Sequence, residues 1–165
     1  MKSLRKTIRQ LILESEGYIE EHPFLAALRS YVDEADGDYG SAFIAIRHPD
    51  GCSTEGYIAL HDEDEKGGIW IDKIEVVNSE RHLDPACFRK GYAKQMLQAL
   101  TRAADETGTH LTLIAASEPY YRRMYPHIQL PDKDQLADLY MGYGFVEEYS
   151  NYAQVKMNRA PRTEQ

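Results

Sequence analysis

A basic pair followed by a glycine stands at the start of a predicted helix. Arg89 and Lys90 precede Gly91, while Tyr92 and Ala93 follow it and open the helical pattern. The first amides of a helix lack partners within it, and the helix dipole adds partial positive charge there. A glycine lets a phosphate approach the backbone closely. The pattern predicts an anion site suited to a pyrophosphate, although a lone glycine at a helix start also occurs in ordinary turns.

The overall charge of the chain argues against some classes of ligand. The chain has 165 residues and a formal net charge of −8. Such a chain repels phosphate over most of its surface, which argues against general nucleic-acid binding. No apolar run approaches the roughly 20 residues that cross a bilayer, and no signal-peptide pattern is present. We therefore expect a cytoplasmic protein that binds neither nucleic acid nor membrane and that tolerates a cationic substrate.

Cysteine and histidine add no further chemistry to the pattern. The two cysteines, Cys52 and Cys87, form neither a disulfide framework nor a metal-ligand spacing, and we interpret them as ordinary thiols. The six histidines are scattered singly, without an HExxH or paired-ligand pattern. We therefore predict no metal site.

The candidate anion site lies between two predicted strands. Residues 69–77 and 111–116 form short apolar runs that are typical of strands. A loop over residues 78–90 leads from the first run to a helix over residues 91–107, where apolar residues recur at helical spacing. Gly108 ends this helix. The predicted unit is therefore strand, loop, helix and strand.

The segments before this unit predict helices and then a hairpin. Residues 1–16 have basic amphipathic spacing, and Pro23 suits the first turn of a second helix that runs to Val32. The turn signal His48-Pro49-Asp50-Gly51 separates apolar runs at 41–47 and 54–61, which predicts a β-hairpin.

The segments after the unit predict a polar insert, a helix and two closing strands. A tyrosine-rich polar stretch covers residues 117–133, a helix follows over 134–143, and strands follow over 145–148 and 152–157. We predict a single α/β domain over residues 1–165. Its first 40 residues are helical, and residues 41–158 form a mixed, mostly antiparallel central sheet flanked by helices.

Four motifs occur in an informative order. They are Gly-Tyr-Ile-Ala-Leu at 56–60, Ile-Asp-Lys-Ile-Glu-Val-Val at 71–77, Arg-Lys-Gly-Tyr-Ala at 89–93 and Leu-Tyr-Met-Gly-Tyr-Gly-Phe at 139–145. Together they resemble the GNAT superfamily of acetyltransferases over residues 41–158. The phosphate loop of that superfamily reads R/Q-x-x-G-x-G/A, and this chain has Phe88 at its first position and a longer loop over 78–90.

The resemblance implies a GNAT-like fold that binds acetyl-CoA as co-substrate. The cofactor would lie where the strand at 69–77 separates from the strand that begins near Leu111. Its pantetheine arm would bind the backbone of Ile74, Glu75 and Val76. Its pyrophosphate would lie on Arg89, Lys90, Gly91, Tyr92 and Ala93.

The resemblance also implies candidate catalytic residues. Tyr140 matches the family tyrosine that protonates the departing thiolate, with Tyr143 as second choice. Asp72 matches an acidic residue proposed as base, and Glu75, on the opposite face by strict alternation, is the alternative. The structural alternatives are that Tyr140 is a packed aromatic and that the acidic residue forms a salt bridge within the strand, for instance with Lys73.

The sequence is compatible with two functions. The first is an N-acetyltransferase that moves an acetyl group from acetyl-CoA to a primary amine of a small molecule or protein. By the resemblance, its acceptor pocket would include Tyr120, Tyr121 and Tyr125. The second is a GNAT-like binding or structural module without turnover, such as a component of a phage particle. A homodimer is left open.

Overall fold

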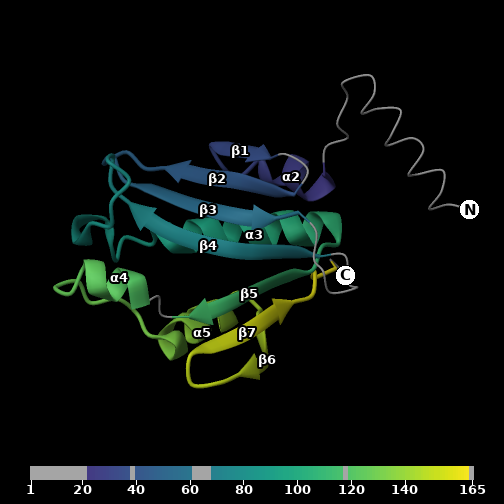
Figure 1. Cartoon of the computed structure of the whole chain (residues 1–165). Coiled ribbons are helices and arrows are strands. Elements are labelled where there is room, and N and C mark those ends of the chain that lie inside the picture. Colours follow the sequence, from purple (N-terminus) through teal and green to yellow (C-terminus); the bar gives the residue numbers. More distant parts are fainter. Residues whose placement is uncertain (1–21, 38–39, 61–67, 117–118, 164–165) are drawn as a thin grey trace, which may run out of the picture.

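The computed structural model describes residues 22–37, 40–60, 68–116 and 119–163, and one mixed sheet dominates this part of the chain (Figure 1). The strands follow the order β1-β2-β3-β4-β5-β7-β6. Only β4 and β5 run parallel, and every other neighbouring pair is antiparallel. The strands are β1 (Glu34–Gly37), β2 (Ser41–Arg47), β3 (Ser53–Ala59), β4 (Ile69–Val77), β5 (Leu111–Ala116), β6 (Val146–Ser150) and β7 (Gln154–Arg159).

Helices flank this sheet, so the predicted fold class is confirmed. They are α2 (Pro23–Leu28), α3 (Tyr92–Thr107), α4 (Pro119–Met124) and α5 (Lys133–Met141), with a 3-10 turn η1 (Pro85–Cys87). The predicted hairpin is also confirmed, because β2 pairs antiparallel with β3 across the 48–51 turn. In the described residues no helix is both long and apolar enough to span a membrane.

The core forms where α2 and α3 pack on the sheet. Figure 1 shows α3 running along the back of β3 and β4. The apolar side of α3 contributes Met96, Leu97 and Leu100, which are fully buried. Ile44 of β2 and Ile58 of β3 are likewise fully buried in the same core cluster. Burial of such side chains, about 1.5–3 kcal/mol each, holds the helix at a fixed height above the strands.

A buried arginine ties the end of the sheet to α3 and α5. Arg159, the last residue of β7, is 3% exposed and donates two hydrogen bonds to the Asp105 carboxylate, at 2.8 and 3.0 Å. Its Nε also donates to the carbonyl of Tyr143, just beyond α5, at 2.7 Å. The fork geometry of a guanidinium suits this bidentate pairing. Arg159 therefore fixes β7, α3 and the end of α5 relative to one another.

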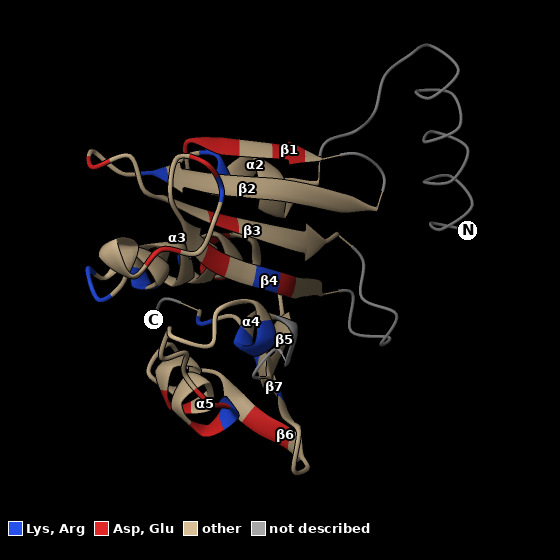
Figure 2. Cartoon of the chain, turned by 60° about the vertical axis from the view of Figure 1, so that its left-hand side comes forward, with Lys and Arg blue, Asp and Glu red and all other residues tan. Residues whose placement is uncertain are grey.

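The N-terminal region differs from the sequence prediction. The helix expected to reach Val32 ends at Leu28, and the polar stretch after it contains the edge strand β1. In β1 only Ala35 is buried, and Glu34 forms an ion pair with Arg47 of β2. Figure 2 shows the acidic residues of this strand at the rim of the sheet. A short, charged edge strand lacks the apolar alternation that identifies a strand in sequence. The predicted helix over residues 1–16 lies outside the described residues.

The interpretation of the cysteines as ordinary thiols is wrong. Cys52 and Cys87 form a disulfide across a sequence separation of 35 residues, with the two Cα atoms 5.8 Å apart. The bond joins the end of the β2–β3 turn to η1, just before α3. Such a pair has no spacing signature, because it depends on tertiary contact between a hairpin turn and a loop.

The cytoplasmic location stays a prediction. Disulfides are rare in proteins of the reducing cytosol. If the Cys52–Cys87 disulfide is present in the cell, it argues against a location in the reducing cytosol.

We predict that removing the disulfide destabilises the fold. The double variant Cys52→Ala, Cys87→Ala should lose about 2–4 kcal/mol of unfolding free energy, because the cross-link restricts the unfolded chain. Denaturant titration measures this loss. Wild-type protein should lose a similar amount when a reductant is added, while the double variant should be indifferent to reductant. A wild-type stability that is unchanged by reductant and equal to that of the variant would contradict the prediction.

Candidate active site

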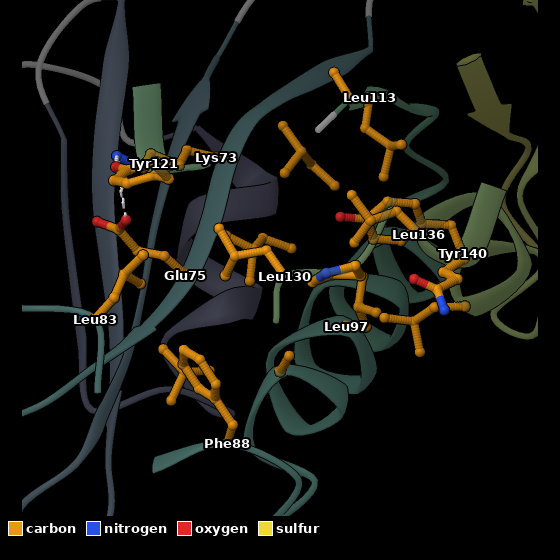
Figure 3. Close-up of a pocket in the computed structure, with 18 of the residues that line it drawn as sticks. Lys73, Glu75, Leu83, Phe88, Leu97, Leu113, Tyr121, Leu130, Leu136 and Tyr140 are labelled. Carbon is orange, nitrogen blue, oxygen red and sulfur yellow. Dashed lines mark hydrogen bonds and ion pairs between the residues drawn. The ribbon is translucent and has the colours of Figure 1, made fainter. Parts of the chain in front are cut away.

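A cavity of about 590 Å³ opens where β4 and β5 separate. The two strands pair only from Ile69 with Leu111 to Ile71 with Leu113. Beyond this point β4 continues to Val77 without pairing with β5. Residues of β4, α3, α5 and the insert between β5 and α5 line the resulting space (Figure 3). The cavity therefore lies in the cleft that the sequence analysis assigned to the cofactor.

The predicted cofactor residues divide into two groups. Those that line the cavity are Ile74, Glu75, Val76, Arg89 and Ala93, together with Phe88. Lys90, Gly91 and Tyr92 are absent from this lining.

Gly91 shapes the start of α3. It is the N-cap residue, with a φ of 76°, and no side-chain hydrogen bond caps the helix. Arg89 also has a left-handed φ, of 59°, which is uncommon for a residue other than glycine. A Cβ added at Gly91 would meet nothing within 4 Å. The glycine is therefore required by the backbone conformation, and the uncapped amides of the first turn remain open to an anion.

Lys90 and Tyr92 bind the β2–β3 turn instead of lining the cavity. The Lys90 ammonium and the Tyr92 hydroxyl each donate to the Asp50 carboxylate at 2.7 Å. The hydrogen bond from Lys90, followed by that from Tyr92, holds the pKa of Asp50 well below its usual range. The His48 ring stacks on the Tyr92 ring at a centroid distance of 3.5 Å. With the disulfide, these contacts fasten the loop before α3 to the hairpin.

A β-bulge in β4 changes the predicted facing of its side chains. Lys73 pairs with Tyr57 and Ile71 pairs with Ile58, so Asp72 has no partner on β3. The bulge breaks strict alternation, and Ile71 shares a face with Ile74 instead of with Lys73. The alternation of side chains along a single strand cannot reveal a bulge, because a bulge is defined by the register with the neighbouring strand.

Asp72 itself is exposed and lines the cavity. Partial desolvation raises the pKa of its carboxyl, and a hydrogen bond with Trp70 partly offsets this effect. A carboxylate with a raised pKa is a better proton acceptor than an unperturbed one. Its position and its basicity are therefore both compatible with the predicted role of base.

A cluster of Lys73, Glu75 and Tyr121 lies at one side of the cavity (Figure 3). The Tyr121 hydroxyl of α4 donates to the Glu75 carboxylate at 3.0 Å and accepts from the Lys73 ammonium. The Lys73 Nζ and the Glu75 Oε2 are 3.2 Å apart. Burial raises the pKa of Tyr121. Burial alone would lower the pKa of Lys73, but the hydrogen bonds with Tyr121 and Glu75 outweigh it and the pKa is raised.

Sequence reasoning placed Tyr121 in an acceptor pocket but gave Lys73 only a structural role. The link between them spans 48 residues, and α4 falls in a stretch described from sequence only as polar and tyrosine-rich. A proline at the first position of a six-residue helix is too weak a signal to identify α4 from sequence.

Tyr140 lies across the cavity from this cluster (Figure 3). Its ring packs edge-on against Phe145, which is 2% exposed. Burial raises the pKa of the Tyr140 phenol, so the hydroxyl keeps its proton at neutral pH. Tyr143, the second candidate, does not line the cavity. Of the two tyrosines, the structure therefore brings only Tyr140 to the cleft.

Comparison with known proteins identifies similar folds but no sequence relative. No protein-family model matches the chain, and no curated protein matches it. A protein assigned as a GNAT-family acetyltransferase from Desulfovibrio desulfuricans is 13% identical, with a TM-score of 0.47 over 73% of this chain and 69% of the other. The PaiA N-acetyltransferase from Thermoplasma acidophilum, in complex with coenzyme A, is 10% identical, with a TM-score of 0.45 over 73% and 61%.

A further similar structure is assigned as an acyl-CoA N-acyltransferase from Klebsiella pneumoniae. It is 18% identical, with a TM-score of 0.47 over 84% of this chain and 88% of the other. These similarities concern the arrangement of helices and strands alone. The chemistry of the protein depends on the residues that line the cleft.

Proposed function

We propose that this protein is an N-acetyltransferase that moves an acetyl group from acetyl-CoA to a primary amine of a small molecule or protein. The observation that carries this proposal is the cleft itself. It runs between separated parallel strands, with the uncapped start of α3 near Arg89 and the protonated phenol of Tyr140 on its α5 wall. Its volume is within the range of about 300–1,000 Å³ that is usual for small-molecule sites.

The free edge of β4 suits the pantetheine arm. Past Ile71, the side of β4 that faces β5 has no strand partner among the described residues, while its other side pairs with β3 as far as Val77. Those backbone N–H and C=O groups of Ile74, Glu75 and Val76 that point toward this edge, and not toward β3, need hydrogen-bond partners. A linear ligand with amide groups supplies them by adding to the sheet like a strand.

The start of α3 suits the pyrophosphate. Its backbone amides and the helix dipole favour an anion, and the Arg89 side chain lines the adjacent cavity. Arg89 supplies the positive charge that the family motif places one residue earlier, where this chain has Phe88. Phe88 also lines the cavity and offers an apolar surface there.

Acetyl transfer requires few groups beyond those that position the reactants. The neutral amine attacks the thioester carbonyl, a C–N bond forms, and the C–S bond breaks. Tyr140 gives its proton to the departing thiolate, and Asp72 takes a proton from the amine, directly or through water. Placing both reactants in one cleft contributes the larger share of the rate acceleration. Glu75 is engaged by Lys73 and Tyr121, which leaves Asp72 as the freer base.

We predict that Arg89 contributes to acetyl-CoA binding and that Lys90 does not. Arg89→Ala should weaken binding about tenfold or more, because charge-assisted hydrogen bonds to phosphate are lost. Lys90→Ala should bind almost like wild type, since its ammonium lies on Asp50 and an exposed ion pair contributes little. Isothermal calorimetry measures both affinities. Equal losses in the two variants would contradict the assignment, and a wild-type protein that binds no acetyl-CoA would contradict the proposed function.

We predict that Tyr140→Phe lowers the transfer rate by about a hundredfold, the usual contribution of a general acid. Its affinity for acetyl-CoA should change little, because the ring is kept. Tyr143→Phe is the matched control and should turn over normally, since Tyr143 lies outside the cavity lining. The measurement is release of free thiol under saturating acetyl-CoA. Equal rates for wild type and Tyr140→Phe would remove this residue from the mechanism.

We predict that Asp72→Asn depresses the rate most at low pH. There the acceptor is an ammonium ion and needs a base, whereas at high pH a fraction of it is already neutral. In the wild type, the rate should fall as the pH drops through the raised pKa of Asp72, because only the carboxylate accepts a proton. A pH–rate profile of kcat/KM tests this behaviour. If Glu75→Gln gives that profile and Asp72→Asn does not, the base has been assigned to the wrong carboxylate.

A further inference from the structure

We propose that the acceptor is a zwitterion whose amine has a carboxylate on the adjacent carbon, as in a free α-amino acid, and that Lys73 binds this carboxylate. The inference rests on the proposed function and names the substrate class of the same cleft. It follows from the cluster of Lys73, Glu75 and Tyr121 at the side of the cavity across from Tyr140 (Figure 3).

The charges that line the cavity are balanced. Among the described residues they are Asp72, Lys73, Glu75 and Arg89. Arg89 lies at the start of α3, where the pyrophosphate is expected. Lys73 is the other cation of the lining, and neither the binding of the nucleotide nor the transfer step uses it. We therefore assign Lys73 a role in binding the acceptor.

Lys73 and Glu75 present opposite charges 3.2 Å apart. An α-amino acid presents the reverse pair, with an ammonium and a carboxylate on one carbon atom. Docked head to tail, its ammonium meets Glu75 and its carboxylate meets Lys73, so each charge keeps an opposite partner. A polyamine or simple amine reaches Glu75 only by competing with Lys73, and it brings a second cation next to that ammonium.

Tyr121 keeps this ion pair in position. Its hydroxyl bonds to both charged groups, and the Lys73 ammonium lies 4.8 Å from the centroid of its ring. The ring therefore still attracts the ammonium when Lys73 leaves Glu75 to bind a ligand carboxylate. The side chains of Lys73 and Glu75 are 36% and 19% exposed, so a ligand can reach them without unfolding.

The reaction leaves the carboxylate untouched. The amine nitrogen loses its proton to the base and forms the C–N bond, while Tyr140 protonates the thiolate. The product is an N-acetyl amino acid with a net negative charge. It keeps its contact with Lys73 but no longer has an ammonium for Glu75, which favours release of the product.

The test compares amino acids with their α-carboxamides, which have nearly the same size and an amine but no negative charge. With acetyl-CoA saturating, wild-type protein should show a kcat/KM at least about tenfold higher for an amino acid than for its amide, across a panel of amino acids. The amine of the amide is the less basic, so easier deprotonation would favour the amide instead. Lys73→Met should abolish the preference, mainly by raising the KM for the amino acid.

Lys133→Met is the matched control. Lys133 also forms an ion pair and is partly exposed, but it lies outside the cavity lining and should leave the preference unchanged. Calorimetry with acetyl-CoA is run in parallel. If acetyl-CoA binds and the amides or polyamines are preferred, if no amino acid reacts, or if Lys73→Met keeps the preference, the inference about the acceptor is overturned. Absence of acetyl-CoA binding instead overturns the proposed function beneath it.

Discussion

Parallel pairing between β4 and β5 ends at Ile71 and Leu113, and the cavity exists because it ends there. A sheet whose strands stayed paired would have no cleft and no free backbone edge. On one side of the gap, the antiparallel ladder with β3 holds β4 as far as Val77. On the other, β5 is held by β7, which Arg159 fixes to α3 through Asp105. The candidate site is thus a gap between two parts of one sheet, each of which is held by its own strand pairs.

The loop before α3 depends on a second set of constraints, which come from the β2–β3 turn. The disulfide fixes Cys87 to Cys52, and Asp50 holds the side chains of both Lys90 and Tyr92. These contacts surround Gly91, whose left-handed backbone opens the helix. Preorganised donors bind an anion better than mobile ones, because less ordering is needed on binding. The β2–β3 hairpin, which is distant in sequence, therefore holds the candidate phosphate site in position.

Local patterns were sufficient to predict much of the fold. Strands β2 to β5 and α3 follow from apolar runs and helical spacing that lie within each element, and the structure confirms them. Gly91 and Gly108 mark the ends of α3 as expected, because both adopt a left-handed φ that glycine permits. The resemblance to the GNAT superfamily placed the cofactor between two strands that do separate in the structure, because its motifs follow the order of these elements.

Long-range contacts account for what the sequence did not predict. The Cys52–Cys87 bond, the pairing of Tyr121 with Lys73 and the edge strand β1 each depend on a partner far along the chain or on a neighbour in the sheet. The bulge at Asp72 changes the facing of β4 through its register with β3, which no single strand reveals. Asp72, Lys73 and Tyr121 line the cleft, so the details of the candidate site were less predictable than the gap between the strands.

Hydrogen–deuterium exchange with and without coenzyme A tests the central claim most directly. If the ligand lies in the gap between β4 and β5, its presence should slow amide exchange at residues 74–76 of β4 and at the start of α3, residues 91–94, while residues of β6 remain unchanged. Protection confined to other segments, or exchange unaffected by saturating ligand, would show that the cleft is not the site of coenzyme A binding.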